Sequence, residues 1–162
     1  MSTVVLGLGN LLMQDDGLGV HTIRALRENF MWPEHVEMVD GGTLGLDLLP
    51  LVTDSARLLI IDAMDMGNEP GTVMRLEGED VPKAWSQKLS VHQAGVQDLL
   101  NIAYFQGWQP QKLVVLGIQP AAVTPGLGLT ESVGGALPQL LQDVCGELTG
   151  WGIRSKKRHP NT

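Results

Sequence analysis

The sequence predicts an α/β fold in which helices cover both faces of a mostly parallel sheet. Short apolar runs rich in Val, Leu and Ile recur along the chain, and such runs are typical of strands buried on both faces. Longer segments with apolar residues at helical spacing separate them. Because strands that alternate with helices connect by right-handed crossovers, the expected architecture has three layers.

The first half of the chain contains two strand and helix units. Residues 4–8 form an apolar run that Gly9 and Asn10 stop, and residues 17–30 have helical periodicity. Residues 36–39 and 44–52 repeat this scheme with a shorter helix. Each unit predicts a parallel strand followed by its helix.

Two further strand candidates lie close together in the middle of the chain. Residues 58–61 are the most apolar of all, and a turn-rich stretch then leads to residues 72–76. The second segment alternates apolar and polar side chains, which is typical of a half-exposed edge strand. Because the connection is short, we expect this edge strand to run antiparallel to its predecessor.

The last part of the chain is expected to return to the alternating scheme. Residues 77–90 are mixed and turn-rich, which predicts a surface excursion before a helix over 92–105. Residues 113–118 form the last strand, and residues 132–148 form the closing helix. The loop between them, 120–130, is rich in proline and glycine.

Length and charge limit the classes of protein that need to be considered. A chain of 162 residues suits one domain, which we place at residues 1–153. The segment 154–162 is polar and holds four of the 11 basic residues, so it is expected to be a basic, disordered tail. The remainder has seven basic residues against 18 acidic ones, a balance that disfavours nucleic acid as a partner.

Cysteine usage and hydropathy bear on the compartment. Cys145 is the single cysteine, and the amino-terminal sequence lacks the pattern of a signal peptide. No apolar run approaches the roughly 20 residues that a membrane-spanning helix needs. We therefore expect a cytoplasmic protein that does not insert into a membrane, and we expect it to be a monomer.

Three predicted strands bring an aspartate to one edge of the sheet. Asp40 and Asp62 each follow an apolar strand run, and Asp15 and Asp16 lie in the loop after the first strand. Ligands bind at this edge in open α/β sheets, outside the carboxyl ends of the strands. An aspartate at a strand end is also a common helix cap or turn former, and for Asp15 we prefer that explanation.

A histidine on another segment completes a possible site for a divalent ion. His92 opens the predicted helix 92–105, which can fold over the same edge. A lone histidine is more often structural, but an imidazole together with the carboxylates of Asp16 and Asp62 makes a reasonable ligand set for nickel or zinc. The absence of thiolates argues against a closed structural zinc site.

Two other kinds of site fail on the residues. Gly7 and Gly9 suggest a dinucleotide-binding loop, but the third glycine of that fingerprint falls at Leu12 and two aspartates follow. Gly9 is better explained as a turn glycine. The chain also lacks the nucleophile-elbow pattern of serine hydrolases, so acyl-enzyme chemistry is not indicated.

Six short motifs in order resemble the nickel-iron hydrogenase maturation endopeptidases, over about residues 3–153. Together they are specific, although each alone is weak. The motifs are Gly7-Leu8-Gly9-Asn10, Asp15-Asp16-Gly17, Val39-Asp40-Gly41-Gly42-Thr43, Asp62-Ala63, Glu69-Pro70-Gly71-Thr72 and His92-Gln93.

The resemblance implies a five-stranded, mostly parallel sheet and a highly selective protease. Members of that family remove a C-terminal extension from the precursor of the hydrogenase large subunit after nickel has been inserted there. Their nickel-recognising residues match Asp16, Asp62 and His92, and Asp40 matches an aspartate implicated in substrate recognition or cleavage. The nickel is then supplied by the precursor rather than held permanently.

Two other functions remain open at this point. A chaperone that holds the nickel-bearing subunit without cutting it would use the same residues. Peptidyl-tRNA hydrolases also open with a strand and Gly-x-Gly-Asn, and their histidine could here be only His21. That alternative is the weaker one, because Leu11 and Leu12 stand where those proteins have Pro-Gly and because the acidic body would repel RNA.

Overall fold

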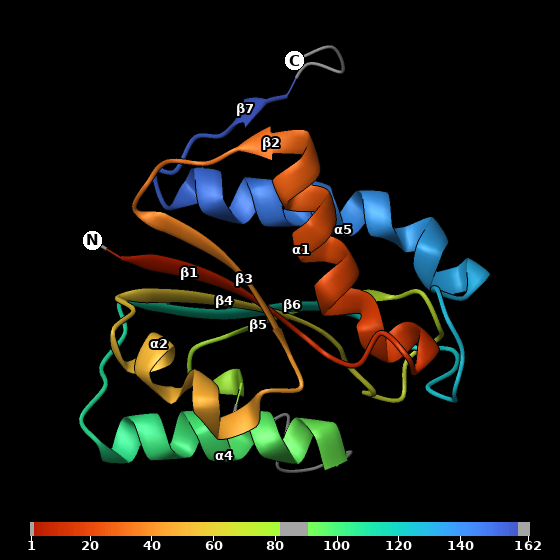
Figure 1. The fold of residues 1–162 in the computed structure, drawn as a ribbon, viewed down its shortest axis with the longest axis horizontal. Coiled ribbons are helices and arrows are strands. Elements are labelled where there is room, and N and C mark those ends of the chain that lie inside the picture. Colours follow the sequence, from red (N-terminus) through yellow and green to blue (C-terminus); the bar gives the residue numbers. More distant parts are fainter. Residues whose placement is uncertain (1, 82–90, 159–162) are drawn as a thin grey trace.

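The computed structural model describes residues 2–81 and 91–158, with side chains described from residue 96 onward in the second range. A five-stranded sheet lies between two layers of helices (Figure 1). The predicted three-layer α/β class is confirmed. No helix in the described ranges is both long enough and apolar enough to cross a bilayer.

Four parallel strands and one antiparallel edge strand make up the sheet. Their order is β3-β1-β4-β6-β5, and only the pairing of β5 with β6 is antiparallel within this sheet. The strands are β1 (Thr3–Leu8), β3 (Val36–Gly42), β4 (Arg57–Ala63), β5 (Val73–Glu77) and β6 (Lys112–Ile118). The edge strand β5 runs antiparallel to β4, as predicted from the short connection, but it pairs with β6.

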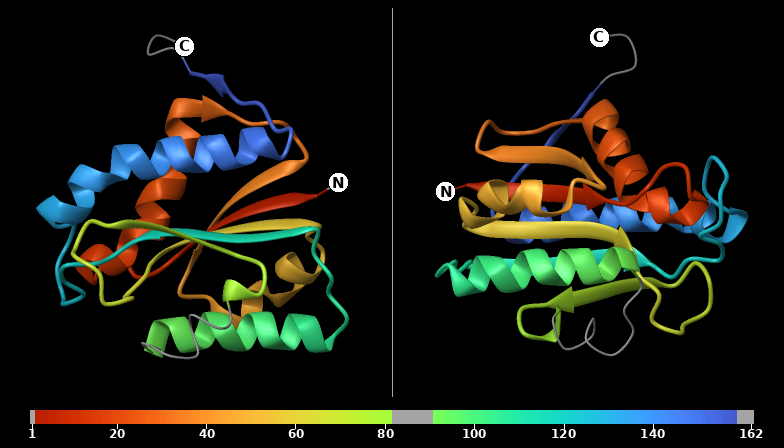
Figure 2. Two further views of the ribbon diagram at one scale, coloured as in Figure 1. Left: turned by 180° about the vertical axis from the view of Figure 1, so that it is seen from behind. Right: turned by 60° about the horizontal axis from the view of Figure 1, so that its bottom comes forward.

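The helices occur where apolar periodicity predicts them. Those on one face are α1 (Leu18–Asn29) and α5 (Glu131–Gly150), and those on the other are α2 (Leu49–Thr53) and α4 (Val91–Phe105). Two 3-10 turns, η1 (Gln14–Gly17) and η2 (Gly45–Leu48), precede α1 and α2. Figure 2 shows from two further directions that the sheet separates these two layers.

Each face of the sheet has its own apolar core, because alternate side chains of a strand point to opposite faces. On β4, Leu58 and Ile60 pack in the core beneath α2 and α4, whereas Leu59 and Ile61 pack in the core beneath α1 and α5. Val81 was expected in a surface excursion, but it is fully buried in the first of these cores. Residues 82–90 of that excursion lie outside the described residues.

Glycines let α1 lie directly against the sheet. A Cβ atom at Gly19 would stand 2.3 Å from the Leu8 carbonyl oxygen and 2.4 Å from that of Ile61. A Cβ atom at Gly7 would stand 2.2 Å from the Gly19 carbonyl oxygen. The sequence therefore uses small residues here to pack backbone on backbone rather than to admit a dinucleotide phosphate.

The basic tail differs from expectation over its described part. Lys156 and Lys157 form the short strand β7 (Lys156–Lys157), which pairs antiparallel with β2 (Phe30–Met31). Arg158 follows, and its Nε donates hydrogen bonds to the carbonyl oxygens of Arg27 and Phe30. These backbone partners, which sequence patterning does not reveal, order residues 156–158 against the end of α1.

Candidate functional site

The candidate site lies at the edge of the sheet where the four parallel strands end. Four loops leave the sheet there, residues 9–17, 43–48, 64–72 and 119–130. Hydrogen bonds join neighbouring strand ends, because the Gly9 N–H donates to the Gly42 carbonyl and the Met64 N–H donates to the Ile118 carbonyl. In Figure 1 this edge is at the right, where α4 and α5 both begin.

Asp16 is positioned by the loop that follows β1. Its carboxylate accepts a hydrogen bond of 3.0 Å from the Asn10 N–H. Gly9 has a φ of +124°, and a Cβ atom there would stand 1.7 Å from the Asp16 carbonyl oxygen. The expected turn glycine is therefore required both by its backbone conformation and by its contact with Asp16.

Asp15 has a role that was not predicted. Its fully buried carboxylate accepts hydrogen bonds from the backbone N–H groups of Ala121, Ala122 and Thr130 and from the Thr130 hydroxyl, at 2.8 to 3.1 Å. Asp15 was expected to be a helix cap or a turn former. It lies in the 3-10 turn η1, but it does not cap α1, whose N-cap is Gly17 without a side-chain cap. Asp15 instead joins residues 9–17 to residues 119–130.

The electrostatics of Asp15 agree with this role. Burial raises the pKa of the Asp15 carboxyl, but the hydrogen bonds from Thr130, Ala122 and Ala121 outweigh burial and hold the pKa below its ordinary value. The carboxylate is thus ionised at neutral pH and satisfied by donors. A buried ion of this kind acts as a structural clamp rather than as a proton carrier.

Backbone hydrogen bonds continue this junction outward. The Gln14 N–H donates to the Gly126 carbonyl at 3.1 Å, and the Gly126 N–H donates to the Leu12 carbonyl at 2.9 Å. The Thr124 hydroxyl adds a bond of 3.0 Å to Gln14 Oε1. The two loops therefore form one continuous structure beside Asp16.

Asp62 is a residue of β4 itself rather than of the loop after it. The strand was predicted to end at Ile61, but it continues to Ala63, and Asp62 pairs with Gly117. Asp62 is fully buried, whereas it was expected after the end of the strand, at the edge where ligands bind. A Cβ atom at Gly117 would stand 2.1 Å from the Asp62 carbonyl oxygen, so a glycine is needed beside it.

Asp16 and Asp62 come from elements that touch. The turn η1, which carries Asp16, packs against β4, which carries Asp62. Along β4, Asp62 has the same parity as Leu58 and Ile60, so its side chain belongs to the face covered by α2 and α4.

Asp40 belongs to the opposite face. The strand β3 extends to Gly42, so Asp40 lies within the strand and pairs with Gly7. It has the parity of Val36 and Met38, which pack in the core beneath α1 and α5. Strand alternation therefore separates the Asp40 side chain from that of Asp62.

His92 is the second residue of α4, and its side chain lies outside the described residues. The first turn of α4 is at the same edge of the sheet as the start of α1 (Figure 1), which η1 with Asp16 directly precedes. Among side chains that the structure describes, no three His, Cys, Asp or Glu residues are placed to hold a metal ion. The predicted set Asp16, Asp62 and His92 thus keeps its status as a prediction.

Gln119 is a site residue that sequence reasoning missed. It follows β6 and is buried, and its Oε1 accepts hydrogen bonds from the N–H groups of Met66 and Asn68 at 2.8 and 3.2 Å. Its Nε2 donates to Asp65 at 3.0 Å. Gln119 therefore ties the loop after Asp62 to the end of β6. A polar residue between an apolar strand and Pro120 was the available signal.

His21, the histidine that the peptidyl-tRNA hydrolase alternative would use, lies on α1. His21 is partly buried and its Nε2 atom has no hydrogen-bond partner. Burial, with a smaller contribution from Arg24, lowers the pKa of His21 and favours the neutral imidazole.

Comparison with known proteins assigns the family. A family model described as hydrogenase maturation protease matches residues 20–147. The chain is 37% identical over 159 residues to the Hydrogenase 2 maturation protease of Escherichia coli, covering 98% of this chain and 97% of that protein. It is 38% identical over 152 residues to the hydrogenase expression/formation protein HupD of Rhizobium leguminosarum, covering 93% of this chain and 75% of that one.

Solved structures show the same fold. The hydrogenase maturating endopeptidase HybD of E. coli superposes with a TM-score of 0.93 at 37% identity, and 98% of each chain is covered. A hydrogenase maturation protease from Thermococcus kodakarensis superposes with a TM-score of 0.73 at 26% identity, covering 89% of this chain and 97% of that one. These matches leave no support for the peptidyl-tRNA hydrolase alternative.

Proposed function

Because the chain belongs to the family of hydrogenase maturation proteases, and is therefore a peptidase, we propose that it removes the C-terminal extension of a hydrogenase large-subunit precursor. We further propose that it acts on the nickel-loaded form and uses the nickel as its recognition element. The observation that carries this proposal is the packing of η1 on β4, which brings the elements of Asp16 and Asp62 together at the edge where α4 begins.

The proposed ligands suit a metal that arrives with the substrate. Carboxylates from Asp16 and Asp62 and the imidazole of His92 are oxygen and nitrogen donors that nickel accepts. An ion held mainly by the precursor can take them as additional ligands, which anchors the scissile bond beside the site. An unmetallated precursor lacks the atom that these residues grip, so selectivity follows from the same contact.

The surroundings of Asp16, Asp62 and Asp40 differ, and they suggest a different role for each carboxylate. The Asn10 N–H holds the Asp16 carboxylate in place. Asp62 has no exposed surface in this structure, so contact with a substrate metal requires a local rearrangement that exposes it. We assign Asp40 to the peptide rather than to the metal, because strand alternation turns it to the other face.

Hydrolysis then requires an activated water next to the anchored bond. The metal can polarise the water or the scissile carbonyl as a Lewis acid. A carboxylate can take the proton from the water as a general base, and Asp16 and Asp40 are the candidates for this role. Neither route needs a covalent intermediate, in agreement with the lack of a conventional nucleophile motif.

The test compares nickel-loaded and nickel-free precursor as substrates of the purified protein, with mass spectrometry of the large subunit as readout. We expect shortening of the nickel-loaded form alone. Equal cutting of both forms would reject nickel recognition, and binding without a change in mass would indicate a chaperone.

Variants at the proposed ligands test the residues themselves. We expect His92→Ala and Asp16→Ala to lose processing while the circular dichroism spectrum stays that of the wild type. His35→Ala and Asp54→Ala are matched controls, because both residues are exposed and lie away from this edge. Unfolding of the two site variants would instead assign Asp16 and His92 a structural role.

We also propose that the reaction takes place in the cytoplasm and that the protein acts as a monomer. A lone, partly buried cysteine, Cys145, suits a reducing compartment. Fractionation of cells and sedimentation of the purified protein test these two statements.

A further inference from the structure

Three apolar side chains are exposed on the two loops that Asp15 joins. Leu12 is 64% exposed, Val123 48% and Leu127 81%. The hydrogen bonds between Gly126 and its partners Leu12 and Gln14 hold this part of the two loops together. We call these three side chains the apolar strip.

Hydrogen bonds anchor the backbone that carries the strip. The carboxylate of Asp15 fixes the base of the two loops through its bonds to Ala121, Ala122 and Thr130. Presenting three exposed apolar side chains on an anchored support costs solvation without any gain in core packing. Such surfaces mark interaction sites in soluble proteins.

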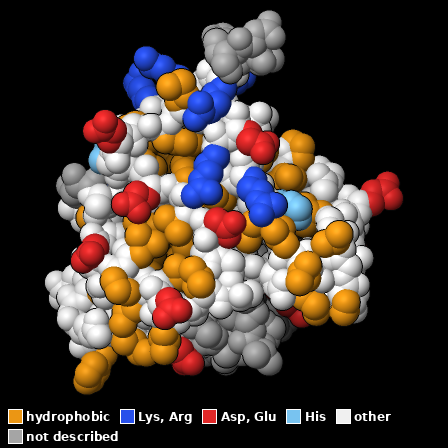
Figure 3. Space-filling view, viewed as in Figure 1, with side chains coloured by type: hydrophobic (Ala, Val, Ile, Leu, Met, Phe, Trp, Pro, Cys, Tyr) orange, Lys and Arg blue, Asp and Glu red, His pale blue; other side chains and the backbone are white. Residues whose placement is uncertain are grey.

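Charge around the strip indicates the chemistry of its partner. The four described loops at this edge contain five acidic residues and no Lys or Arg, the acids being Asp15, Asp16, Asp47, Asp65 and Glu69. The described basic residues lie on α1, at the amino ends of β4 and β6, on β5 and in residues 154–158. On the face drawn in Figure 3, the Lys and Arg side chains lie in the upper half, whereas Asp and Glu side chains are scattered over the whole face. Lys83 and Lys88 belong to the undescribed segment.

We propose that the apolar strip, with the acidic loops around it, docks a segment of the large-subunit precursor that carries apolar side chains flanked by Lys or Arg. This inference rests on the proposed function, and it names a recognition surface besides the metal. Apolar contact supplies affinity, and the acidic loops attract and orient the cationic residues. A second copy of this chain is the poorer occupant, because it would bring two acidic edges together.

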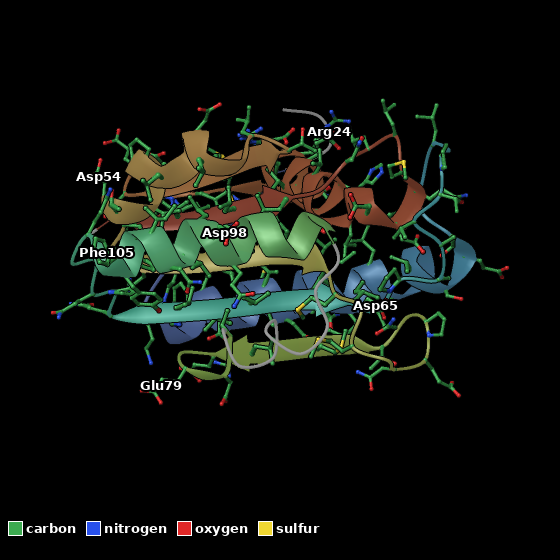
Figure 4. All side chains as sticks on the ribbon, turned by 90° about the horizontal axis from the view of Figure 1, so that it is seen from below. Arg24, Asp54, Asp65, Glu79, Asp98 and Phe105 are labelled. Atoms are coloured by element: carbon green, nitrogen blue, oxygen red, sulfur yellow. The ribbon has the colours of Figure 1, made fainter. Side chains whose placement is uncertain are left out.

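The first test measures binding and cleavage of nickel-loaded precursor by a double variant, Leu12→Ser with Leu127→Ser. Both side chains are exposed, so folding should persist. We expect the dissociation constant to rise by about tenfold or more, as the loss of buried leucine contacts predicts, with the single-turnover rate at saturation unchanged. The matched control is Phe105→Ser, a side chain 93% exposed at the opposite end of the molecule (Figure 4). It should bind as the wild type does.

The second test reverses the charge of one acid in the four loops at this edge and of one acid outside them. Asp47→Lys changes an exposed acid in η2, and Asp54→Lys changes an exposed acid at the end of α2, which Figure 4 shows at the side of Phe105 and away from Asp65. At low salt we expect only Asp47→Lys to slow association, by about threefold or more, and 0.5 M salt to remove most of that difference.

The outcomes separate this inference from the proposed function. Wild-type binding and cleavage by the Leu12 and Leu127 double variant would overturn docking on the strip while leaving proteolysis intact. Binding that the variant weakens, with no cleavage by any form, would reject proteolysis and keep the docking surface. A dimer that the double variant dissociates, with precursor binding unchanged, would assign the strip to a second copy and overturn the proposal.

Discussion

The carboxylate of Asp15 accepts hydrogen bonds from both the backbone N–H and the side-chain hydroxyl of Thr130, which lies 115 residues further along the chain. Asp15 stands next to Asp16, and Thr130 is the N-cap residue of α5. One buried carboxylate thus connects the loop of a proposed ligand to the start of the longest helix. The position of Asp16 depends on contacts that no local sequence pattern contains.

Replacing Asp15 with asparagine should destabilise the protein strongly. The amide would offer an N–H2 group to backbone donors and would lose a charge that several hydrogen bonds stabilise. We expect a loss of about 2–4 kcal/mol in the free energy of unfolding, measured by urea denaturation. The control Asp54→Asn changes an exposed side chain and should stay within about 0.5 kcal/mol of the wild type. An Asp15→Asn variant with the same free energy of unfolding as the wild type would show that the clamp contributes little.

The same clamp should make stability depend on acid pH. The pKa of Asp15 is lower in the folded protein than its ordinary value, so its stabilising effect is complete above the unfolded pKa, about 3.9. That effect is lost as the pH falls from there through the folded pKa. We expect the stability gap between wild type and Asp15→Asn to be constant from pH 7 to about 5 and to narrow below about pH 4. A gap that widens on acidification would contradict the clamp.

Glu147 also makes the stability of the protein fall at acid pH. The pKa of Glu147 is held low chiefly by its hydrogen bonds with Arg75, which join β5 to α5. The wild type and Asp15→Asn both retain the pair of Glu147 and Arg75, so the effect of this pair cancels in the difference between their stabilities. This is why the gap between the two proteins, rather than the stability of either one, reports on Asp15.

Local sequence patterns predict most of the fold because its elements are strongly apolar or strongly periodic. The strands β1, β4 and β6 are nearly continuous runs of Val, Leu and Ile, and their positions follow from composition alone. The pairing of β5 with β6 was not predicted, because it depends on residues 64–72 passing the end of β6, where the Gly71 N–H bonds to the Gln119 carbonyl. The strand ends at Asp40 and Asp62 were placed too early, because polar residues there continue the ladder.

The site was only partly accessible to sequence reasoning. Spacing and motif order single out Asp16, Asp40 and Asp62. The faces of the sheet to which Asp40 and Asp62 point depend on where β3 and β4 end and on the alternation of side chains along them, which single residues do not show. The roles of Asp15 and Gln119 escaped because their partners are distant backbone groups. A motif in sequence indicates candidate side chains, whereas the three-dimensional structure reveals what holds them.

Gly9 should tolerate alanine far less well than another glycine with positive φ. Gly9 and Gly107 have φ values of +124° and +92°, so alanine is strained at both. A Cβ atom at Gly9 would also stand 1.7 Å from the Asp16 carbonyl oxygen, whereas at Gly107 it would meet nothing within 4 Å. We expect Gly107→Ala to cost about 1 kcal/mol and Gly9→Ala more than about 3 kcal/mol in urea denaturation. Equal losses of unfolding free energy in the two variants would mean that backbone strain alone determines the cost of alanine.

Asp62 and Asp40 should fail in different ways when each is changed to asparagine, because strand alternation turns their side chains to opposite faces of the sheet. If Asp62 contacts the substrate metal, Asp62→Asn should abolish the preference for nickel-loaded over nickel-free precursor in equilibrium binding. Asp40→Asn should keep that preference within about threefold and lower the single-turnover cleavage rate by about 100-fold or more, as expected for a group that acts on the peptide. Asp54→Asn should match the wild type in both measurements. Equal loss of nickel-dependent binding in the Asp40 and Asp62 variants would mean that the two carboxylates act on one metal despite their parity.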